Sequence, residues 1–283
     1  MRDRFLTGLI GYPIAHSAAP AMHEQAAAAL GCHGHYQLIE VPGAARDDLR
    51  AMLDGIRRLG FAGVNVTFPY KEAVVELLDD MSADARAIGA VNTIVVDGAR
   101  LVGHNTDASG FARAIKPLLA ATPDGAIALI GAGGVGKAIA FALAGLGAGE
   151  LRIFDADAAK AAQLADQLRH RGAVHAASIK AAVDGAAGLV NATPVGMLPN
   201  RDTPVPDRLL HPAMWVADAV YTPLWTPLLS AAKAKGAEVM TGRDLAIGAA
   251  ADAFALFTGR TAPVAAMGNA FDAVMAARYA SSA

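Results

Sequence analysis

The chain of 283 residues is 54% apolar and carries a formal net charge of −2, with both signs scattered along its length. This length allows one large or two moderate domains that bury a substantial core. The scattered charge excludes the basic stripe of a nucleic-acid or anionic-membrane binder, and the single cysteine, Cys32, excludes an intramolecular disulfide. Because no apolar signal region or membrane-spanning run stands out, a cytoplasmic globular protein is expected.

The first part of the chain alternates between two kinds of apolar pattern. Strands are expected at residues 6–10, 36–41, 63–66 and 93–96, and helices at residues 20–30, 44–59 and 71–78. This alternation is typical of an α/β domain built on its own sheet. A helix at residues 108–119 is then expected to lead into a second domain.

A glycine-rich turn, Gly131-Ala-Gly-Gly-Val-Gly136, follows the strand-like segment 127–130 and opens an apolar helical run. In a dinucleotide-binding unit the first glycine makes the tight turn, the second lets the backbone approach a pyrophosphate, and the third lets the helix pack on the strand. Phosphate charge then meets unpaired N–H groups at the helix N-terminus. A glycine turn in an Ala-rich chain can be only a turn, but the flanking strand and helix favour a cofactor site. The candidate residues of that site are Gly131, Ala132, Gly133, Gly134 and Val135.

The choice of cofactor depends on Asp155, which ends the next strand about 20 residues past the glycine turn. A carboxylate there accepts hydrogen bonds from the adenosine ribose hydroxyls and repels a 2′-phosphate, so NAD is predicted rather than NADP. As an alternative, Asp155 caps the following helix, but Asp157 stands directly before that helix and is the better cap. Arg152 would complicate the prediction if it turned toward a phosphate, and the strand period places it away from the buried side.

The second domain continues with strands and ends in helices. Strands are expected at residues 151–154, 188–191, 215–218 and 238–240, and helices at residues 244–257 and 263–279. The final helices are expected to fold back on the first domain. The predicted fold class is therefore α/β with two domains: an N-terminal substrate-binding domain of residues 1–107 and 244–283, and a Rossmann NAD-binding domain of residues 108–243.

Polar side chains gather on the loops of the first domain. They occur in GYPIAHS with PAMH (residues 11–17 and 20–23), NVTFPYK (65–71), GAVNT (89–93) and GHNTD (103–107). Each group has a simple structural interpretation: Asn65 and Asn92 form turns, Lys71 is a solvated lysine, and Asp107 caps the helix that follows it. Together, however, they supply complementary groups for a polyhydroxylated acid, and the first loop opens onto a helix N-terminus that suits a carboxylate.

Eight blocks, in order and over nearly the whole chain, resemble the shikimate dehydrogenase family. They are GYPIAHSAAPAMH, GVNVTFPYK, GAVNT, GHNTD, GAGGVGKA, NATPVGM, DAVYTPLWTPLL and AIGAAADAFALFTG. The resemblance implies a substrate domain and a Rossmann domain with a cleft between them, and reversible hydride transfer between a ring alcohol and a nicotinamide, as in aromatic amino acid biosynthesis. Asp155 is similar to the NAD-preferring shikimate/quinate dehydrogenase branch, since the NADP-dependent members usually carry Asn-Arg-Thr around this point.

The resemblance also implies roles for individual residues. Lys71 and Asp107 match the catalytic pair beside the hydroxyl that becomes a ketone, where the lysine exchanges the proton and the carboxylate orients it. Ser17 matches a substrate-carboxylate ligand. The other substrate-binding matches are Thr67 and Asn92, which bind ring hydroxyls, and Tyr221, which closes over the substrate. The further cofactor-binding matches are Asn191, Ala192, Thr193 and Gly242.

Two departures from the family's pattern leave the substrate open. Ala19 stands where a second hydroxyl residue is usual, and Ala249 stands where a glutamine is usual. Two lost hydrogen bonds would weaken affinity by about tenfold to several hundredfold. If shikimate or quinate is nevertheless a good substrate, His16, His23 or Tyr12 would be the first candidates to hold its carboxylate.

The leading hypothesis is an NAD-dependent dehydrogenase of shikimate or quinate, working on a small hydroxy acid as a monomer or homodimer. A different cyclic hydroxy acid, or a catalytically silent protein that binds NAD and a ligand, are the alternatives. The retention of both Lys71 and Asp107 argues against the silent protein. No metal is expected, because His33 and His35 share a strand face but lack further plausible ligands.

Overall fold

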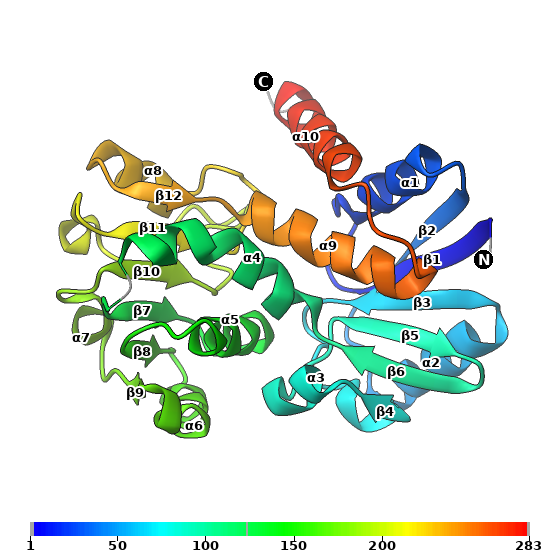
Figure 1. Ribbon diagram of the computed structural model, residues 1–283, viewed down its shortest axis with the longest axis horizontal. Coiled ribbons are helices and arrows are strands. Elements are labelled where there is room, and N and C mark those ends of the chain that lie inside the picture. Colours follow the sequence, from blue (N-terminus) through cyan, green and yellow to red (C-terminus); the bar gives the residue numbers. More distant parts are fainter. Residues whose placement is uncertain (1–2, 123, 282–283) are drawn as a thin grey trace. The chain divides into compact units, whose positions relative to one another are not determined.

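The computed structural model describes residues 3–122 and 124–281, and the chain divides into two compact units. Unit 1 comprises Met1–Thr106 and Ile247–Ala283, and unit 2 comprises Asp107–Ala246. Within the described residues, each unit contains one six-stranded sheet (Figure 1). The predicted α/β class with two domains is confirmed, and no described helix has the length and apolar character needed to cross a membrane.

The sheet of unit 1 is mixed. Its strands are β1 (Arg4–Gly11), β2 (His33–Glu40), β3 (Phe61–Val66), β4 (Asp80–Met81), β5 (Thr93–Asp97) and β6 (Arg100–His104), in the order β2-β1-β3-β5-β6-β4. β1 pairs in parallel with β2 and β3, while β5 pairs antiparallel with β3 and β6. The C-terminal ends of β1 and β3 therefore lie at the same edge as the first residue of β5 and the last residue of β6.

Helices cover both faces of this sheet because neighbouring residues of a strand point to opposite faces. The helices of unit 1 are α1 (Ala19–Ala29), α2 (Arg46–Arg58), α3 (Ala83–Ile88), the part of α9 (Gly242–Thr258) from Ile247 onward, and α10 (Val264–Ser281). On one face Leu49 and Leu53 of α2 pack against Ile10 of β1. On the other, Phe257 of α9 packs against Ala62 of β3. The C-terminal helices thus return to unit 1, as predicted.

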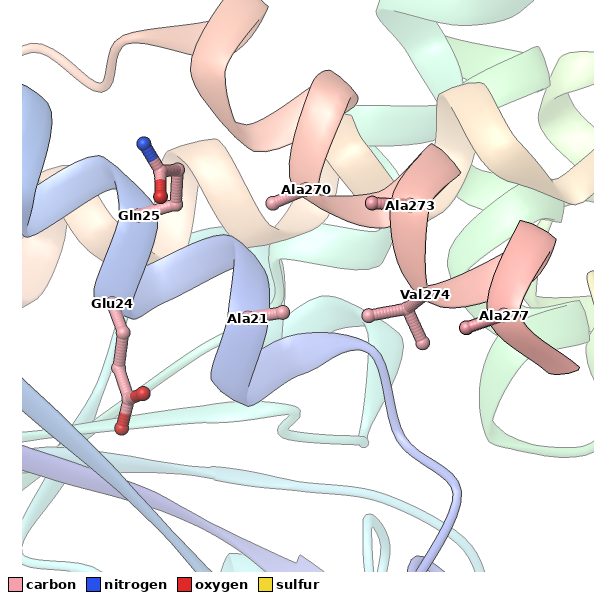
Figure 2. A pocket seen from close by; sticks show the side chains of 7 residues that line it. All are labelled: Ala21, Glu24, Gln25, Ala270, Ala273, Val274 and Ala277. Carbon is pink, nitrogen blue, oxygen red and sulfur yellow. The ribbon is translucent and has the colours of Figure 1, made fainter.

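Helix α10 lies beside α1, and several of the side chains that face each other there are short. Figure 2 shows Ala21 of α1 facing Ala270 and Ala273 of α10 across a shallow hollow, with Glu24 and Gln25 at its α1 side. This hollow contains none of the candidate site residues.

The sheet of unit 2 is parallel throughout. Its strands are β7 (Ile127–Ile130), β8 (Leu151–Phe154), β9 (Ala173–His175), β10 (Gly188–Asn191), β11 (Trp215–Asp218) and β12 (Glu238–Met240), in the order β12-β11-β10-β7-β8-β9. Its helices are α4 (Thr106–Ala121, from Asp107 onward), α5 (Gly134–Gly145), α6 (Ala158–Gln167), α7 (Ile179–Val183) and α8 (Pro227–Ala234). Leu129 packs on the side of α4 and α5, while Ala128 packs on the side of α7 and α8, so both faces are buried.

Several segments differ from the sequence prediction, which did not include strands β4 and β9 or helix α3. The helix expected at residues 71–78 is a turn followed by a short 3₁₀ segment, Val75–Leu77. The Lys71 carbonyl accepts a hydrogen bond from the Val91 N–H at 2.8 Å instead of one from its own next turn, and a β-branched pair at 74–75 does not favour a helix. The prediction also missed strand β6, although Asp97-Gly98 at the end of β5 is a hairpin signal and Gly98 has a φ of +62°.

Candidate active site

The glycine turn of unit 2 combines a tight turn, an open backbone and a close approach of helix α5. Gly131 has a φ of +107°, and a Cβ there would lie 2.9 Å from backbone atoms of Ala192. A Cβ at Gly136 would lie 2.1 Å from the Gly131 carbonyl oxygen, so α5 reaches the turn only because this residue has no side chain. At Gly133 a Cβ would meet nothing within 4 Å. The backbone is therefore open to a ligand at Gly133, next to the N-terminus of α5.

The glycine turn lies at the topological switch point of the unit 2 sheet. From β7 the chain proceeds to β8 and β9 on one side, and β10, β11 and β12 lie on the other. Ligands of doubly wound sheets bind at such a point, outside the C-terminal ends of the strands. The segment Asn191–Thr193 leaves β10 there, and its Ala192 and Thr193 contact the position of Gly131. The structure thus brings the two predicted cofactor segments together.

Asp155 reaches back from the end of β8 to the glycine turn. Its Oδ2 accepts a hydrogen bond from the Ala132 N–H at 2.6 Å, and its Oδ1 accepts one from the Asp157 N–H at 2.8 Å. Asp157, not Asp155, caps α6 by accepting from the Ala159 and Lys160 N–H groups, as predicted. The guanidinium of Arg152 contacts Glu150 and the carbonyl of Asp184. The charge beside the turn is therefore the carboxylate of Asp155.

Tyr221 and Gly242 follow the ends of β11 and β12. Tyr221 is half-buried in the loop after β11. Gly242 is the first residue of α9, and a Cβ there would lie 2.6 Å from the Val220 carbonyl oxygen and 2.7 Å from that of Ala219. The loop that carries Tyr221 therefore packs on the start of α9 through the missing side chain of Gly242.

In unit 1, the loop after β1 and the turn after β3 lie side by side. The Tyr12 N–H donates to the Phe68 carbonyl at 3.0 Å, and a Cβ at Gly11 would lie 2.3 Å from the Thr67 methyl group. The Oγ of Ser17 accepts from the Ala19 N–H at 3.2 Å, at the start of α1, which leaves its hydroxyl hydrogen to donate. Two predicted substrate ligands, Ser17 and Thr67, thus lie on adjacent segments.

Asn92 belongs to a buried network of polar side chains. Its Oδ1 accepts from the Thr106 N–H at 2.7 Å and from the Thr93 hydroxyl at 3.1 Å, and its Nδ2 donates to the Thr106 hydroxyl at 3.0 Å. Asn65 extends the network by donating to the Thr93 hydroxyl and accepting from Tyr36 at 2.8 Å. Asn65 and Asn92 therefore do more than form turns, because they join β2, β3 and β5 to the start of α4.

This network fixes the surroundings of the predicted catalytic pair. Lys71 is half-buried, and its backbone is tied to Val91 in the turn before Asn92. Asp107 is buried and is the second residue of α4, so it is not the N-cap of that helix. The preceding Asn105 donates to the Ala90 carbonyl at 2.9 Å, which ties this segment to the same turn. Lys71 lies in unit 1, and Asp107 is the first residue of unit 2.

His23 lies in the core, away from the loop in which the sequence grouped it. It is 2% exposed and stacks on Tyr36, with ring centroids 4.6 Å apart, and the rings of Phe254 and Phe257 lie about 6 Å from it. Its Nδ1 has no hydrogen-bond partner among the described residues. Burial lowers the pKa of His23 to about 3, so the ring is neutral at physiological pH. The prediction of His23 as a carboxylate ligand is therefore wrong, whereas Tyr12 and His16 are exposed.

Sequence reasoning missed the residues that support the site. Tyr36, Thr93 and Thr106 lie in the unit 1 network, and Asp218 is a buried carboxylate at the end of β11. Thr93 and Thr106 belong to the quoted GAVNT and GHNTD blocks, but Thr93 also contacts Asn65, and Thr106 contacts Thr93, across 28 and 13 residues of sequence. Only the fold brings these side chains into contact.

A parallel sheet with a glycine turn at its switch point in unit 2, and hydroxyl, amide and ammonium side chains on the loops of unit 1, are typical of an oxidoreductase of the NAD(P)-dependent class that acts on CH–OH groups. Residues 9–94 match the family described as "Shikimate dehydrogenase substrate binding domain". The chain is 42% identical to a shikimate dehydrogenase (NADP(+)) of Streptomyces avermitilis, over 92% of each chain.

Two further relatives are quinate enzymes. The chain is 43% identical to a quinate/shikimate dehydrogenase (NAD(+)) of Corynebacterium efficiens, over 91% of this chain and 94% of that one. A solved quinate dehydrogenase of Corynebacterium glutamicum in complex with NAD superposes with a TM-score of 0.87 at 40% identity, over 95% of this chain and 99% of the other. The chain therefore belongs to the shikimate dehydrogenase family.

Proposed function

We propose that this protein is an NAD-dependent dehydrogenase that oxidises a ring hydroxyl of shikimate or quinate. The reaction is reversible, so the enzyme also reduces 3-dehydroshikimate or 3-dehydroquinate. The relatives use NAD in some cases and NADP in others, so they leave the cofactor open. The observation that carries the proposal is the Asp155 carboxylate, hydrogen-bonded to the Ala132 N–H of the glycine turn. A 2′-phosphate at this place would face a negative charge, and Arg152 is engaged elsewhere.

The residues of unit 2 fit a nicotinamide dinucleotide. The open backbone at Gly133 and the N-terminus of α5 suit a pyrophosphate, and the turn Asn191–Thr193 flanks them at the switch point. When bound, NAD supplies the hydride acceptor, a chemistry that no side chain provides. The protein's own part is to hold the dinucleotide, exclude water and move one proton.

The proton is assigned to Lys71. Oxidation of an alcohol requires that the hydroxyl proton leave together with the hydride, so a base must stand beside the hydroxyl. In the proposal the Lys71 amine takes this proton at Nζ, and the Asp107 carboxylate orients the amine. The anchoring of Lys71 to Val91 and of Asn105 to Ala90 supports this role, because both segments are fixed to one turn.

Substrate binding is assigned to the polar edge of unit 1. The hydroxyl hydrogen of Ser17 points to the substrate carboxylate, while Thr67 and Asn92 bind ring hydroxyls. Asn92 has one amide hydrogen outside its contacts with Thr93 and Thr106, which it can donate to a ligand. Tyr221 closes over the substrate, and unit 1 acts as the substrate domain.

A second candidate keeps the chemistry and changes the substrate. Neither alanine side chain can form a hydrogen bond with a substrate. The backbone N–H of Ala19 already donates to Ser17, and Ala249 is half-buried on α9. Both positions would bear polar side chains in a pocket built for shikimate. This favours another cyclic hydroxy acid as the physiological substrate.

The test is NADH or NADPH formation by purified protein over shikimate, quinate and related cyclic hydroxy acids, with NAD and NADP in parallel. NAD-linked oxidation of shikimate or quinate supports the leading proposal, and NAD-linked oxidation of an analogue alone supports the second candidate. Absence of turnover with all of them, despite NAD binding, would contradict both.

We further propose that the protein is cytoplasmic and that it works as a monomer or homodimer.

A further inference from the structure

Asp218 is a buried carboxylate that none of the proposed chemical steps uses. It is the last residue of β11 and is 1% exposed. Its Oδ1 accepts hydrogen bonds from the Asn191 amide and the Val220 N–H, both at 2.9 Å, and its Oδ2 accepts from the Thr226 hydroxyl at 2.7 Å. Burial raises the pKa of Asp218 to about 6, against the effect of these donors. At neutral pH it is therefore a charged acceptor inside the unit.

Asp218 determines how the Asn191 side chain is oriented. One amide hydrogen of Asn191 goes to Asp218, and the other goes to the Val195 carbonyl at 3.1 Å. With both N–H bonds directed in this way, the amide oxygen faces the Thr193 N–H and hydroxyl, at 3.0 and 2.7 Å. The Thr193 hydroxyl in turn accepts from the Val195 N–H at 3.1 Å. The turn after β10 is thus closed around one amide, and that amide is held by one carboxylate.

The other contacts of Asp218 keep the carboxylate itself in place. Thr226 caps α8 by accepting from the Leu229 N–H, and it gives its hydroxyl hydrogen to Asp218. Val220 lies in the loop that packs on Gly242. Because an ionised carboxylate accepts at both oxygens, it can hold three donors from three segments at once. An amide in its place would present N–H groups to the Thr226 hydroxyl.

The turn that Asp218 organises is the one beside the glycine turn. Ala192 and Thr193 lie within 2.9 Å of the Cβ position of Gly131, so a displaced turn would meet the glycine turn or open a gap next to it. We infer that Asp218 is a positioning residue for the dinucleotide: through Asn191 it fixes the turn 191–195 against the glycine turn, and thereby sets the affinity for the cofactor. The inference rests on the proposed function only in that unit 2 binds a nicotinamide dinucleotide.

The experiment compares three variants of the full-length protein by calorimetric titration with NAD and with NADP, next to their thermal unfolding. Asp218→Ala removes all three hydrogen bonds of the carboxylate. Asp218→Asn keeps an oxygen that accepts from Asn191 and replaces the oxygen that accepts from Thr226 by an NH2 group. Thr122→Val is the matched structural control, since it removes the 2.9 Å hydrogen bond from Trp215 at the opposite end of the same strand.

Asp218→Ala is expected to raise the Kd of the preferred dinucleotide by about tenfold or more, and Asp218→Asn by a smaller factor. Thr122→Val is expected to lower Tm but to leave Kd within about twofold of wild type. The inference is overturned if the Asp218 variants bind as wild type does, or if Kd rises in Thr122→Val in proportion to its loss of Tm. Should Asp218→Ala not fold, Asp218→Asn decides alone.

Failure of the proposed function has a different signature. A wild-type protein that binds NAD but oxidises neither shikimate nor quinate would remove the proposed reaction, while the Kd values would still decide the role of Asp218. A wild type that binds neither dinucleotide would overturn both.

Discussion

The two units hold their candidate sites by different means. In unit 1, hydrogen bonds between side chains do most of this, besides the close approach at Gly11: those of Asn65 and Asn92 connect three strands and a helix. In unit 2, close backbone packing holds much of the site in place, because Gly131, Gly136 and Gly242 let backbone segments approach to distances that a Cβ would forbid. We therefore expect graded losses for substitutions in the hydrogen-bond network of unit 1 and steep steric losses for substitutions at the unit 2 glycines.

The largest effect on turnover is expected from Lys71→Ala in unit 1. The rate should fall by about 10²–10⁴, because proton transfer is lost, while NAD affinity changes little. Single-turnover and steady-state rates with the best substrate, together with NAD titration, measure both quantities. Lys160→Ala, an exposed lysine on α6, is the control. Near-wild-type turnover of Lys71→Ala would remove this residue from the mechanism.

A matched set of glycine substitutions tests the steric part of the comparison. Gly136→Ala should destabilise unit 2 and abolish NAD binding, since its Cβ would lie 2.1 Å from a carbonyl oxygen. Gly133→Ala should fold as wild type does but bind NAD at least about tenfold more weakly, because its Cβ occupies the ligand's side of an open backbone. Gly145→Ala, whose Cβ also meets nothing, should change neither quantity. Normal NAD affinity in Gly133→Ala would place the pyrophosphate elsewhere.

The substrate end of unit 1 is expected to respond in hydrogen-bond-sized steps. Ala19→Ser with Ala249→Gln should improve shikimate or quinate as a substrate by about tenfold or more, mainly in KM, because these contacts exist in ground and transition states alike. Kinetics on both acids provide the measurement, and each single variant serves as a control for the other. If wild type already has a micromolar KM and the double variant is no better, other groups hold the carboxylate, with His16 and Tyr12 first to be tested.

The smallest effect concerns pH and stability. The pKa of His23 is about 3 in the native state, against about 6.5 unfolded, so the unfolded chain binds the extra proton between these values. The free energy of unfolding therefore falls as the pH decreases through this window, by about 1.4 kcal/mol per pH unit. His23→Phe keeps the aromatic stack and lacks the proton site. Between pH 7 and pH 5 its free energy of unfolding should therefore fall by about 2 kcal/mol less than that of wild type.

Urea unfolding at several pH values measures this difference, and His33→Gln, on the exposed face of β2, is the control. The same slope in wild type and His23→Phe would show that His23 is not the group responsible. Asp218 in unit 2 acts in the opposite direction: its native pKa of about 6 is raised, so its contribution to stability falls as the pH increases from about 4 to about 6.

How much the sequence could predict also differs between the units. The glycine turn and Asp155 were predictable because the determinants lie within one strand-turn-helix-strand segment, where φ preference and spacing carry the signal. The unit 1 network was not, since Tyr36, Asn65 and Thr93 meet only after three strands have paired. His23 was misplaced for the same reason: a histidine next to a polar loop looks available until Phe254 and Phe257, far along the chain, cover it. The strand β6 was missed despite a local Asp-Gly signal, which was the avoidable error.

We propose that the Asp155 carboxylate makes this member of the family an NAD enzyme. The most direct test of this proposal is the ratio of kcat/KM with NAD to kcat/KM with NADP on one good substrate, for wild type and for Asp155→Asn combined with Ala156→Arg. The account predicts that wild type prefers NAD by about tenfold or more, and that the double variant shifts toward NADP because repulsion is removed and a phosphate partner is added. Equal efficiency of wild type with both cofactors would contradict it.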